Sequence, residues 1–279
     1  MSDDNREKAL KYHRFPTPGK LRIEATTPLT SQNDLTLAYS PGVAYPCLEI
    51  EKDPLTAREY TARANLIGVV TNGTAVLGLG NIGAMAAKPV MEGKAVLFKR
   101  FAGIDVFDIE IAEKDPHKLS ETIERLEPTF CGINLEDIKA PDCFYVEKYL
   151  HERMSIPVFH DDQHGTAIVV AAAMKSALEV VGKDINKVRL VASGAGAAAL
   201  SCLNLLVSMG LDKNNVLVCD SRGVIYEGRS ESMDEYKAAY AVNTELRSLA
   251  DAIDGADVFL GLSAGNLLKP EMVESMTQK

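Results

Sequence analysis

The sequence has no excess of positive charge, no long apolar run and few cysteines. Lys and Arg number 30 against 39 Asp and Glu, which leaves a net charge of −9. No broad positive field is therefore available to hold a nucleic acid or an anionic membrane surface. No run of about 18 apolar residues marks a membrane span, and residues 1–12 are too polar for a secretory signal. These absences predict a cytoplasmic protein that has neither nucleic acid nor membrane as a partner.

The cysteines form no metal or redox motif. They are odd in number and widely spaced, at positions 47, 131, 143, 202 and 219, and no C-x-x-C pair is present. Because free cysteine is most often simply buried, we interpret all five as reduced and mostly structural.

Length and composition indicate a globular protein of two domains. The 279 residues are 46% hydrophobic and 25% charged, which is enough apolar material for one large core or two smaller ones. Pro and Gly punctuate the first 50 residues, as in Tyr39-Ser40-Pro41-Gly42. Since proline restricts φ and glycine permits sharp turns, this segment predicts an ordered arm rather than a helix bundle.

Beyond Tyr60 the pattern alternates strands and helices. Several short apolar runs predict strands, and Asn72-Gly73 between the first two is typical of a hairpin turn. The predicted strands cover residues 66–70, 75–79, 94–98, 106–111, 131–134 and 156–159, with an amphipathic helix at 116–126.

The second half of the chain predicts a long helix and a βαβ unit. The helix covers 166–181 and is capped by Gly182, and the unit comprises a strand at 187–192, a helix to 209 and a strand at 215–219, with a further strand at 257–262. We therefore predict an α/β protein. Residues 1–163 form a mixed α/β domain, and residues 164–279 form a Rossmann-like doubly wound domain whose sheet is incomplete within this sequence.

Two glycine loops compete for a dinucleotide, one at 78–83 (G-x-G-x-x-G) and one at 194–199 (G-x-G-x-x-A). The cofactor needs a strand, a tight turn at a helix N-terminus for the pyrophosphate, and a second strand ending beside the ribose about 20 residues on. The second loop meets each requirement, because the next strand ends at Asp220, whereas Phe98-Lys99-Arg100 follows the first loop at that distance. The cofactor is therefore assigned to Gly194, Ala195, Gly196, Ala197 and Ala198.

The residues after that next strand bear on the choice between NADP and NAD. Asp220 would favour NAD by accepting a hydrogen bond from the ribose 2′-hydroxyl, whereas Ser221 and Arg222 would suit a 2′-phosphate. We prefer NADP and keep NAD as the alternative. The other interpretation of Arg222 is a solvated turn residue.

Two carboxylate pairs stand just beyond predicted strands, Glu136-Asp137 and Asp161-Asp162. Their oxygens suit Mg²⁺ or Mn²⁺, which prefer hard ligands, whereas zinc would favour the histidines and cysteines. Turn capping or salt bridging explains either pair more readily when it is taken alone. Only their joint appearance predicts a metal site.

Lys94 and Tyr39 are candidates for proton transfer. A lysine that opens an apolar strand would, if buried, have a lowered pKa and be able to act as a general base. The alternative for Lys94 is a surface lysine at a strand end, and the alternative for Tyr39 is a packed aromatic residue.

As an ordered set, these motifs resemble those of malic enzymes. The resemblance rests on residues 39–44, 76–83, 93–94, 132–137 and 159–162, and it extends from about Phe15 to Leu262. It is strongest with the bacterial NADP-dependent type, in which a phosphotransacetylase-like domain often follows the malic enzyme part. It implies that residues 1–163 bind substrate and metal, that malate is oxidised and decarboxylated to pyruvate and CO₂, and that the protein forms homodimers or larger homo-oligomers.

By residue, the resemblance implies a catalytic group and a metal site. Tyr39 matches the general acid that protonates the product carbon after decarboxylation, and Lys94 matches the base that takes the hydroxyl proton of malate. Asp161 matches a carboxylate near that lysine, and the metal ligands match Glu136, Asp137 and Asp162.

Two departures leave other hypotheses open. Longer eukaryotic members carry an arginine for the substrate carboxylate where this chain reads Asn72-Gly73-Thr74-Ala75, and the family continues beyond Lys279 with segments that complete the malate and nicotinamide site. One alternative is therefore an inactive fragment that serves as a dimerisation or metabolite-binding module. Another is a hydroxy-acid dehydrogenase without decarboxylation, in which the metal carboxylates would have no role.

Overall fold

The computed structural model describes residues 3–76 and 78–277, and the chain divides into two compact units. The first unit joins Met1–Ile138 with Val146–Phe159, and the second joins Lys139–Tyr145 with His160–Lys279. Each unit is therefore built from segments that are separated in the sequence.

The N-terminal arm, residues 3–65, consists of short helices and connecting segments, and none of its residues is buried. Ser31 caps its second helix, because the Ser31 hydroxyl accepts from the Asp34 N–H and the Asp34 carboxylate accepts from the Ser31 N–H. The prediction of an ordered arm without a bundle core is confirmed. Its helices are α1 (Asp3–Arg14), α2 (Gln32–Ala38), α3 (Ala44–Lys52) and α4 (Ala57–Tyr60), with 3-10 turns at Pro54–Thr56 and Ala62–Ala64.

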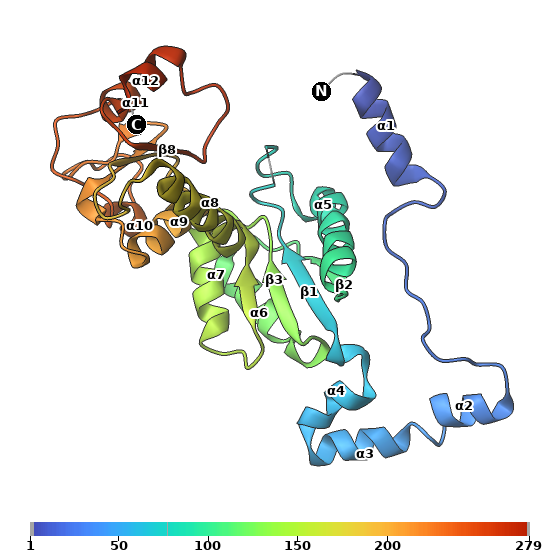
Figure 1. The fold of residues 1–279 in the computed structure, drawn as a ribbon. Helices are drawn as coiled ribbons and strands as arrows, with labels where there is room; N and C mark the ends of the chain where they lie inside the picture. The colour runs from blue at the N-terminus through green and yellow to red at the C-terminus, as the bar shows by residue number, and fades with distance from the viewer. Residues whose placement is uncertain (1–2, 77, 278–279) are drawn as a thin grey trace. The chain divides into compact units, whose positions relative to one another are not determined.

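The first unit is built on a sheet with the strand order β2-β1-β3-β4 (Figure 1). Strand β1 pairs in parallel with both β2 and β3, so their carboxyl ends lie at one edge of the sheet. Both strands are buried, and most of their residues are apolar, as expected for a parallel sheet that is covered on both faces. The strands are β1 (Leu66–Thr71), β2 (Asp105–Glu110), β3 (Gly132–Leu135) and β4 (Val158–His160), and the helices are α5 (Ala84–Leu97), α6 (Pro116–Glu124) and α7 (Asp142–His151).

Two predictions in this region were wrong. Lys94 does not open a strand, because it lies on α5, which continues into a π-helical turn at Phe98–Ala102. A short apolar run does not distinguish a buried helix from a strand by its pattern alone.

The predicted hairpin at Asn72-Gly73 is also absent. The Gly73 carbonyl accepts from the N–H groups of Ile82 and Gly83, which closes a loop in place of a second strand. Only an isolated bridge joins Val76 to Gly80, and residue 77 of the predicted strand lies outside the described residues.

The second unit holds a sheet of order β7-β6-β5-β8, in which β5 is parallel to β6 and β8 and β7 is antiparallel to β6. This arrangement confirms the predicted α/β class and the βαβ unit. The strands are β5 (Leu190–Ser193), β6 (Val216–Asp220), β7 (Gly223–Val224) and β8 (Val258–Gly261), and the helices are α8 (Thr166–Val181), α9 (Ala197–Ser208), α10 (Glu235–Ala238), α11 (Leu249–Ile253) and α12 (Pro270–Ser275).

Apolar side chains cover both faces of this second sheet. Leu190 and Ala192 belong to one core cluster with Leu203 of α9, whereas Val191 belongs to another with Ile253 of α11. Successive residues of a strand point to opposite faces, so Leu190, Val191 and Ala192 are all apolar because helices cover both sides.

One helical stretch, Asp161–Val181, is long and apolar enough to cross a membrane, judged by length and composition only. It begins with two aspartates, and Ala171, Met174 and Leu178 from it are buried in the core. Core helices of soluble proteins pass the same test, so this helix is weak support for a membrane span.

Candidate active site

A cavity of about 600 Å³ lies at the carboxyl ends of the strands in the second sheet. Doubly wound α/β proteins bind ligands at this position. The cavity is lined by the turn after β5, the end of β6, the residues after β8 and the start of α10, namely Gly194, Ala195, Gly196, Asp220, Ser221, Ser232, Asp234, Lys237 and Ser263.

The turn after β5 is shaped to approach an anion closely. Gly194 has a φ of +126°, and a Cβ there would lie 2.7 Å from the Leu262 carbonyl oxygen. Gly196 is the N-cap of α9 and offers no side-chain hydrogen bond, so the N–H groups of the first turn, which begins with Ala197 and Ala198, have no side-chain cap. Such N–H groups, together with the helix dipole, suit a pyrophosphate.

The glycine loop at 78–83 also lies between a parallel strand and a helix, because it connects β1 to α5. The following strand, β2, ends at the acidic residue Glu110. The sequence argument that separated the two glycine loops was therefore incomplete, since it rested on a misplaced strand.

Asp220 at the end of β6 is held by two cations. Its carboxylate lies 2.5 Å from Arg229 Nη2 and 3.2 Å from Lys237 Nζ, and it also accepts from the Arg222 N–H at 2.9 Å. Burial disfavours the charged carboxylate, but the hydrogen bonds from Arg229, Arg222 and Lys237 outweigh it, so the pKa of Asp220 lies below its ordinary value. The Asp220 carboxylate is therefore already paired with cations in the absence of a dinucleotide.

Lys237 is the cation of this group that lines the cavity, and the sequence analysis missed it. Its ammonium group donates to the Ser232 carbonyl at 2.8 Å and lies beside Ser221 and Asp220 in the cavity wall. Arg222 is not among the described residues of that wall, and it pairs at 3.3 Å with Glu231. Lys237 stands 17 positions after Asp220, and no local motif distinguishes it from a surface lysine.

In the first unit, Lys94 lies beside Glu136. The Lys94 Nζ atom is 3.2 Å from Glu136 Oε1, and the exposed fractions of the two side chains are 20% and 7%. The other carboxylate oxygen of Glu136 accepts from Asn134 Nδ2 at 2.9 Å. The remaining amide oxygen, Asn134 Oδ1, is buried and has no hydrogen-bond partner among the described residues.

Asp137 follows Glu136 in an uncommon backbone conformation, with a φ of +55°. Its carbonyl accepts from the N–H groups of Thr74 and Ala75 at 3.1 and 2.9 Å, so the loop after β1 is tied to the end of β3. Both Glu136 and Asp137 are buried. Buried carboxylates require a compensating charge or hydrogen bonds.

Asp161 and Asp162 form the first half of a π-helical turn, Asp161–Gly165, that leads into α8. A Cβ at Gly165 would overlap the Asp161 carboxylate, which explains the glycine in this turn. In the chain, this turn follows β4, and the Glu136-Asp137 pair follows β3, which is the neighbour of β4 in the first sheet.

Tyr39 lies at the end of α2 and is 71% exposed. Its hydroxyl makes no hydrogen bond within the described part of the chain. The alternative of a packed aromatic residue does not describe its environment in this structure.

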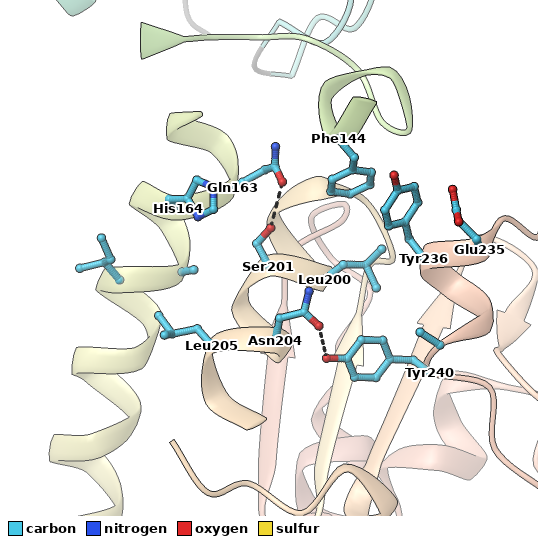
Figure 2. Close-up of a pocket in the computed structure, with 13 residues that line it drawn as sticks. Phe144, Gln163, His164, Leu200, Ser201, Asn204, Leu205, Glu235, Tyr236 and Tyr240 are labelled. Carbon is cyan, nitrogen blue, oxygen red and sulfur yellow. Dashed lines mark hydrogen bonds between the residues drawn. The ribbon is translucent and has the colours of Figure 1, made fainter. Parts of the chain in front are cut away.

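A second cavity, of about 540 Å³, lies between α8, α9 and α10 in the second unit (Figure 2). The Tyr240 hydroxyl donates to Asn204 Oδ1 at 2.7 Å, and the Ser201 hydroxyl donates to Gln163 Oε1 at 3.4 Å. These contacts tie α9 to the π-helical turn before α8 and to the residues after α10. None of the motif residues assigned above is among the described residues that line this cavity.

Comparison with known proteins assigns a family description to each half of the chain. Residues 18–151 match the family described as malic enzyme, N-terminal domain, and residues 163–279 match the malic enzyme, NAD binding domain. The chain is 64% identical over 279 residues to an NADP-dependent malic enzyme of Escherichia coli, and 63% identical over 278 residues to an NAD-dependent malic enzyme of Rhizobium meliloti. These alignments take in all of this chain but only 37% and 36% of those proteins.

A solved structure supports the same relationship. The NAD-dependent malic enzyme of Thermotoga maritima superposes with a TM-score of 0.90 at 43% identity, over all of this chain and 73% of that one.

Proposed function

The chain belongs to the malic enzyme family, and we propose from this premise that the protein oxidises and decarboxylates malate, with NADP and a divalent metal ion. The observation that carries the proposal is the Lys94–Glu136 pair at the end of β3, because it joins a candidate base to a candidate metal ligand. Since the chain spans 37% of the length of its E. coli relative, the activity is proposed for the whole protein.

The metal would be held by Glu136, Asp137 and Asp162. Support comes from their chemistry and placement, because carboxylate oxygens are the ligands that Mg²⁺ and Mn²⁺ prefer. The two carboxylate pairs follow neighbouring strands of one sheet. The buried Asn134 Oδ1 atom, which lacks a hydrogen-bond partner among the described residues, adds a further hard oxygen beside Glu136. The residues therefore fit a hard divalent cation.

When bound, the ion would polarise the C2 hydroxyl of malate and the dinucleotide would accept the hydride from C2. Lys94, as the neutral amine, would accept the hydroxyl proton and become the ammonium form, and Asp161 would orient this lysine. Glu136 contacts Lys94, which holds the Lys94 Nζ atom in place before the substrate binds. Tyr39 would donate a proton to the carbon that loses CO₂, which yields pyruvate.

The cofactor is proposed to be NADP, bound by the turn at 194–198. Lys237 and Ser221 in the cavity wall supply a cation and a hydroxyl for the 2′-phosphate. Asp220, which would otherwise accept from a 2′-hydroxyl, is engaged by Arg229 and Lys237. NAD remains the alternative, since a relative at 63% identity is described as NAD-dependent.

The protein is further proposed to be cytoplasmic and to form a homodimer or a larger homo-oligomer. The exposed N-terminal arm supports self-association, because it has no core of its own.

The test is malate-dependent reduction of NADP and of NAD with Mn²⁺ present, together with detection of pyruvate and CO₂. Reduction that requires Mn²⁺ and yields pyruvate would establish the reaction. Metal-independent reduction without CO₂ would favour the hydroxy-acid dehydrogenase. If neither NADP nor NAD is reduced, the result would favour the alternative of an inactive fragment that serves as a dimerisation or metabolite-binding module.

A further inference from the structure

The short helix α10 contributes to the walls of both cavities in the second unit. Lys237 of α10 and its cap Asp234 line the cofactor cavity, whereas Glu235 and Tyr236 of the same helix line the second cavity. Neighbouring residues of one helical turn therefore border two different spaces. A contact that fixes α10 from the side of the second cavity also fixes Lys237 in the first.

The helix α10 does not hold this position by itself. It has four residues, none of which is buried, and its cap is the Asp234 carboxylate, which accepts from the Lys237 N–H at 2.9 Å. Nucleation of a helix is unfavourable, so a single turn has no stability in isolation. On one side the helix borders a cavity of about 540 Å³. Side chains that reach from α10 to other elements must therefore hold it in place.

The strongest of these attachments is a pair of aromatic rings. The ring centroids of Phe144 and Tyr236 lie 4.2 Å apart with their planes inclined at 34°, and Figure 2 shows the two side chains next to each other. Aromatic pairs of this kind are stabilising beyond the area that they bury. Neither ring is among the described residues that line the cofactor cavity.

The partner ring is itself tied to the cofactor cavity. The Phe144 N–H donates to the Pro141 carbonyl at 3.0 Å, and Ala140 and Pro141 line that cavity. The ring pair therefore joins two parts of the same wall, one at residues 140–141 and the other at α10. It does so from outside the space that the dinucleotide would occupy.

A second attachment holds the chain just after α10. Tyr240 is 5% exposed, its hydroxyl donates to Asn204 Oδ1 at 2.7 Å, and Lys213 Nζ lies 4.9 Å from the centroid of its ring. Lys237 lies between the two tyrosines in the chain and is adjacent to Tyr236. Tyr236 is therefore the anchor that bears most directly on the position of Lys237.

The position of the α10 backbone matters because Lys237 is long and flexible. A lysine side chain loses about 2 kcal/mol of rotamer entropy when it is fixed in one geometry. Lys237 makes its contacts with the Ser232 carbonyl at 2.8 Å and with Asp220 at 3.2 Å from the end of this side chain. Displacement of α10 would draw the ammonium group away from both.

We propose that Tyr236 is a positioning residue for the cofactor: its ring, held by Phe144, fixes α10 so that the Lys237 ammonium group meets the 2′-phosphate of NADP. This inference rests on the proposed function, in which Lys237 binds that phosphate. Tyr236 then contributes to the preference for NADP over NAD without contacting either dinucleotide.

The test compares Tyr236→Ala with Tyr236→Phe in the whole protein. Dissociation constants for NADP and NAD give the ratio of the two affinities. We expect Tyr236→Ala to lower the NADP preference by about 2- to 12-fold, which corresponds to loss of one aromatic pair. Tyr236→Phe keeps the ring and should keep the wild-type ratio. If Tyr236→Ala leaves the ratio unchanged, or if Tyr236→Phe lowers it equally, the proposal is overturned.

A double variant shows whether the ring acts through the lysine. In a protein that already carries Lys237→Gln, adding Tyr236→Ala should lower the NADP preference no further, because the group that the ring positions is gone. A further loss of the preference in that background would overturn the proposal. If Lys237→Gln alone leaves the preference unchanged, the proposed role of Lys237 fails, and this outcome is distinct from failure of Tyr236 alone.

Two more variants guard against a general loosening of the fold. Phe144→Leu removes the ring pair from the other side and should also lower the NADP preference, even if Tyr236→Ala does not fold. An unchanged preference in Phe144→Leu would overturn the proposal. Tyr226→Ala is the matched control, because Tyr226 is a half-buried tyrosine of the same unit that stacks on Arg247 at 3.7 Å and lies outside the described lining of both cavities. An equal loss of preference in this control would also overturn the proposal.

Discussion

Replacing Lys237 with glutamine should separate NADP from NAD binding. In the structure, the Lys237 side chain is 18% exposed, and its ammonium group lies 3.2 Å from Asp220. A hydrogen bond to a charged group contributes about 1.5–3 kcal/mol. Since each 1.4 kcal/mol is a factor of ten, Lys237→Gln should weaken NADP binding by about 10- to 150-fold.

NAD has no 2′-phosphate, so its affinity should change by less than about threefold, because most single surface changes alter free energies by under 0.5 kcal/mol. Dissociation constants for NADP, NADPH, NAD and NADH, measured by titration calorimetry, provide the comparison. Lys187→Gln is the matched control, because Lys187 is an exposed lysine of the same unit outside the cavity wall. Equal losses for the phosphorylated and unphosphorylated forms would refute the role assigned to Lys237.

Three further outcomes are expected. Asp220→Asn leaves the cation of Arg229, whose side chain is 4% exposed, without its carboxylate, and should lower the free energy of unfolding by about 3 kcal/mol. Because the pKa of Asp220 is lowered in the folded state, this stabilisation is complete above about pH 4 and lost as the pH falls further. Chemical denaturation of the wild type and of Asp220→Asn from pH 7 downward should show that the difference between their free energies of unfolding narrows only below about pH 4. A difference in the free energy of unfolding that closes near pH 6 would contradict the assignment. Asp162→Asn should abolish both turnover and Mn²⁺ binding, whereas Lys94→Ala should abolish turnover and leave the Mn²⁺ affinity nearly intact. Calorimetry with Mn²⁺ measures metal binding, and steady-state assays measure turnover. Turnover in either variant would remove that residue from the mechanism. Arg222→Ala should weaken the binding of NADP more than that of NAD, because the guanidinium group would leave Glu231 for the 2′-phosphate. Dissociation constants for both dinucleotides test this, and similar losses for the two would remove Arg222 from that role.

Much of the fold follows from local pattern. The helix Thr166–Val181 was predicted to the residue, and its end at Gly182, with a φ of +66°, follows from the need for a left-handed residue at the cap. The parallel strands β5 and β6 of the second unit are apolar up to their last residues, and the helix α9 between them predicts a parallel βαβ arrangement.

The errors share one cause, which is that neighbours far along the chain decide the outcome. The apolar run at 94–98 fits a strand or a buried helix equally well, and packing of Met91 and Ala95 of α5 into the core selects the helix. The Asn72-Gly73 turn fits a hairpin, but the loop is tied instead to Asp137 by two backbone hydrogen bonds. No local signal carries that information.

By itself, the sequence determined the α/β class, the glycine turn at 194–196 and the candidate carboxylates and lysine, because each depends on residue type and short spacing. Only the tertiary structure placed Lys94 on a helix beside Glu136, engaged Asp220 with Arg229 and Lys237, and left the arm with Tyr39 uncovered. Contacts of this kind join residues 9 to 42 positions apart, and their formation depends on how whole helices and strands pack. The chemistry of the side chains can therefore be predicted from the sequence, but the partner of each charged group depends on how the helices and strands pack.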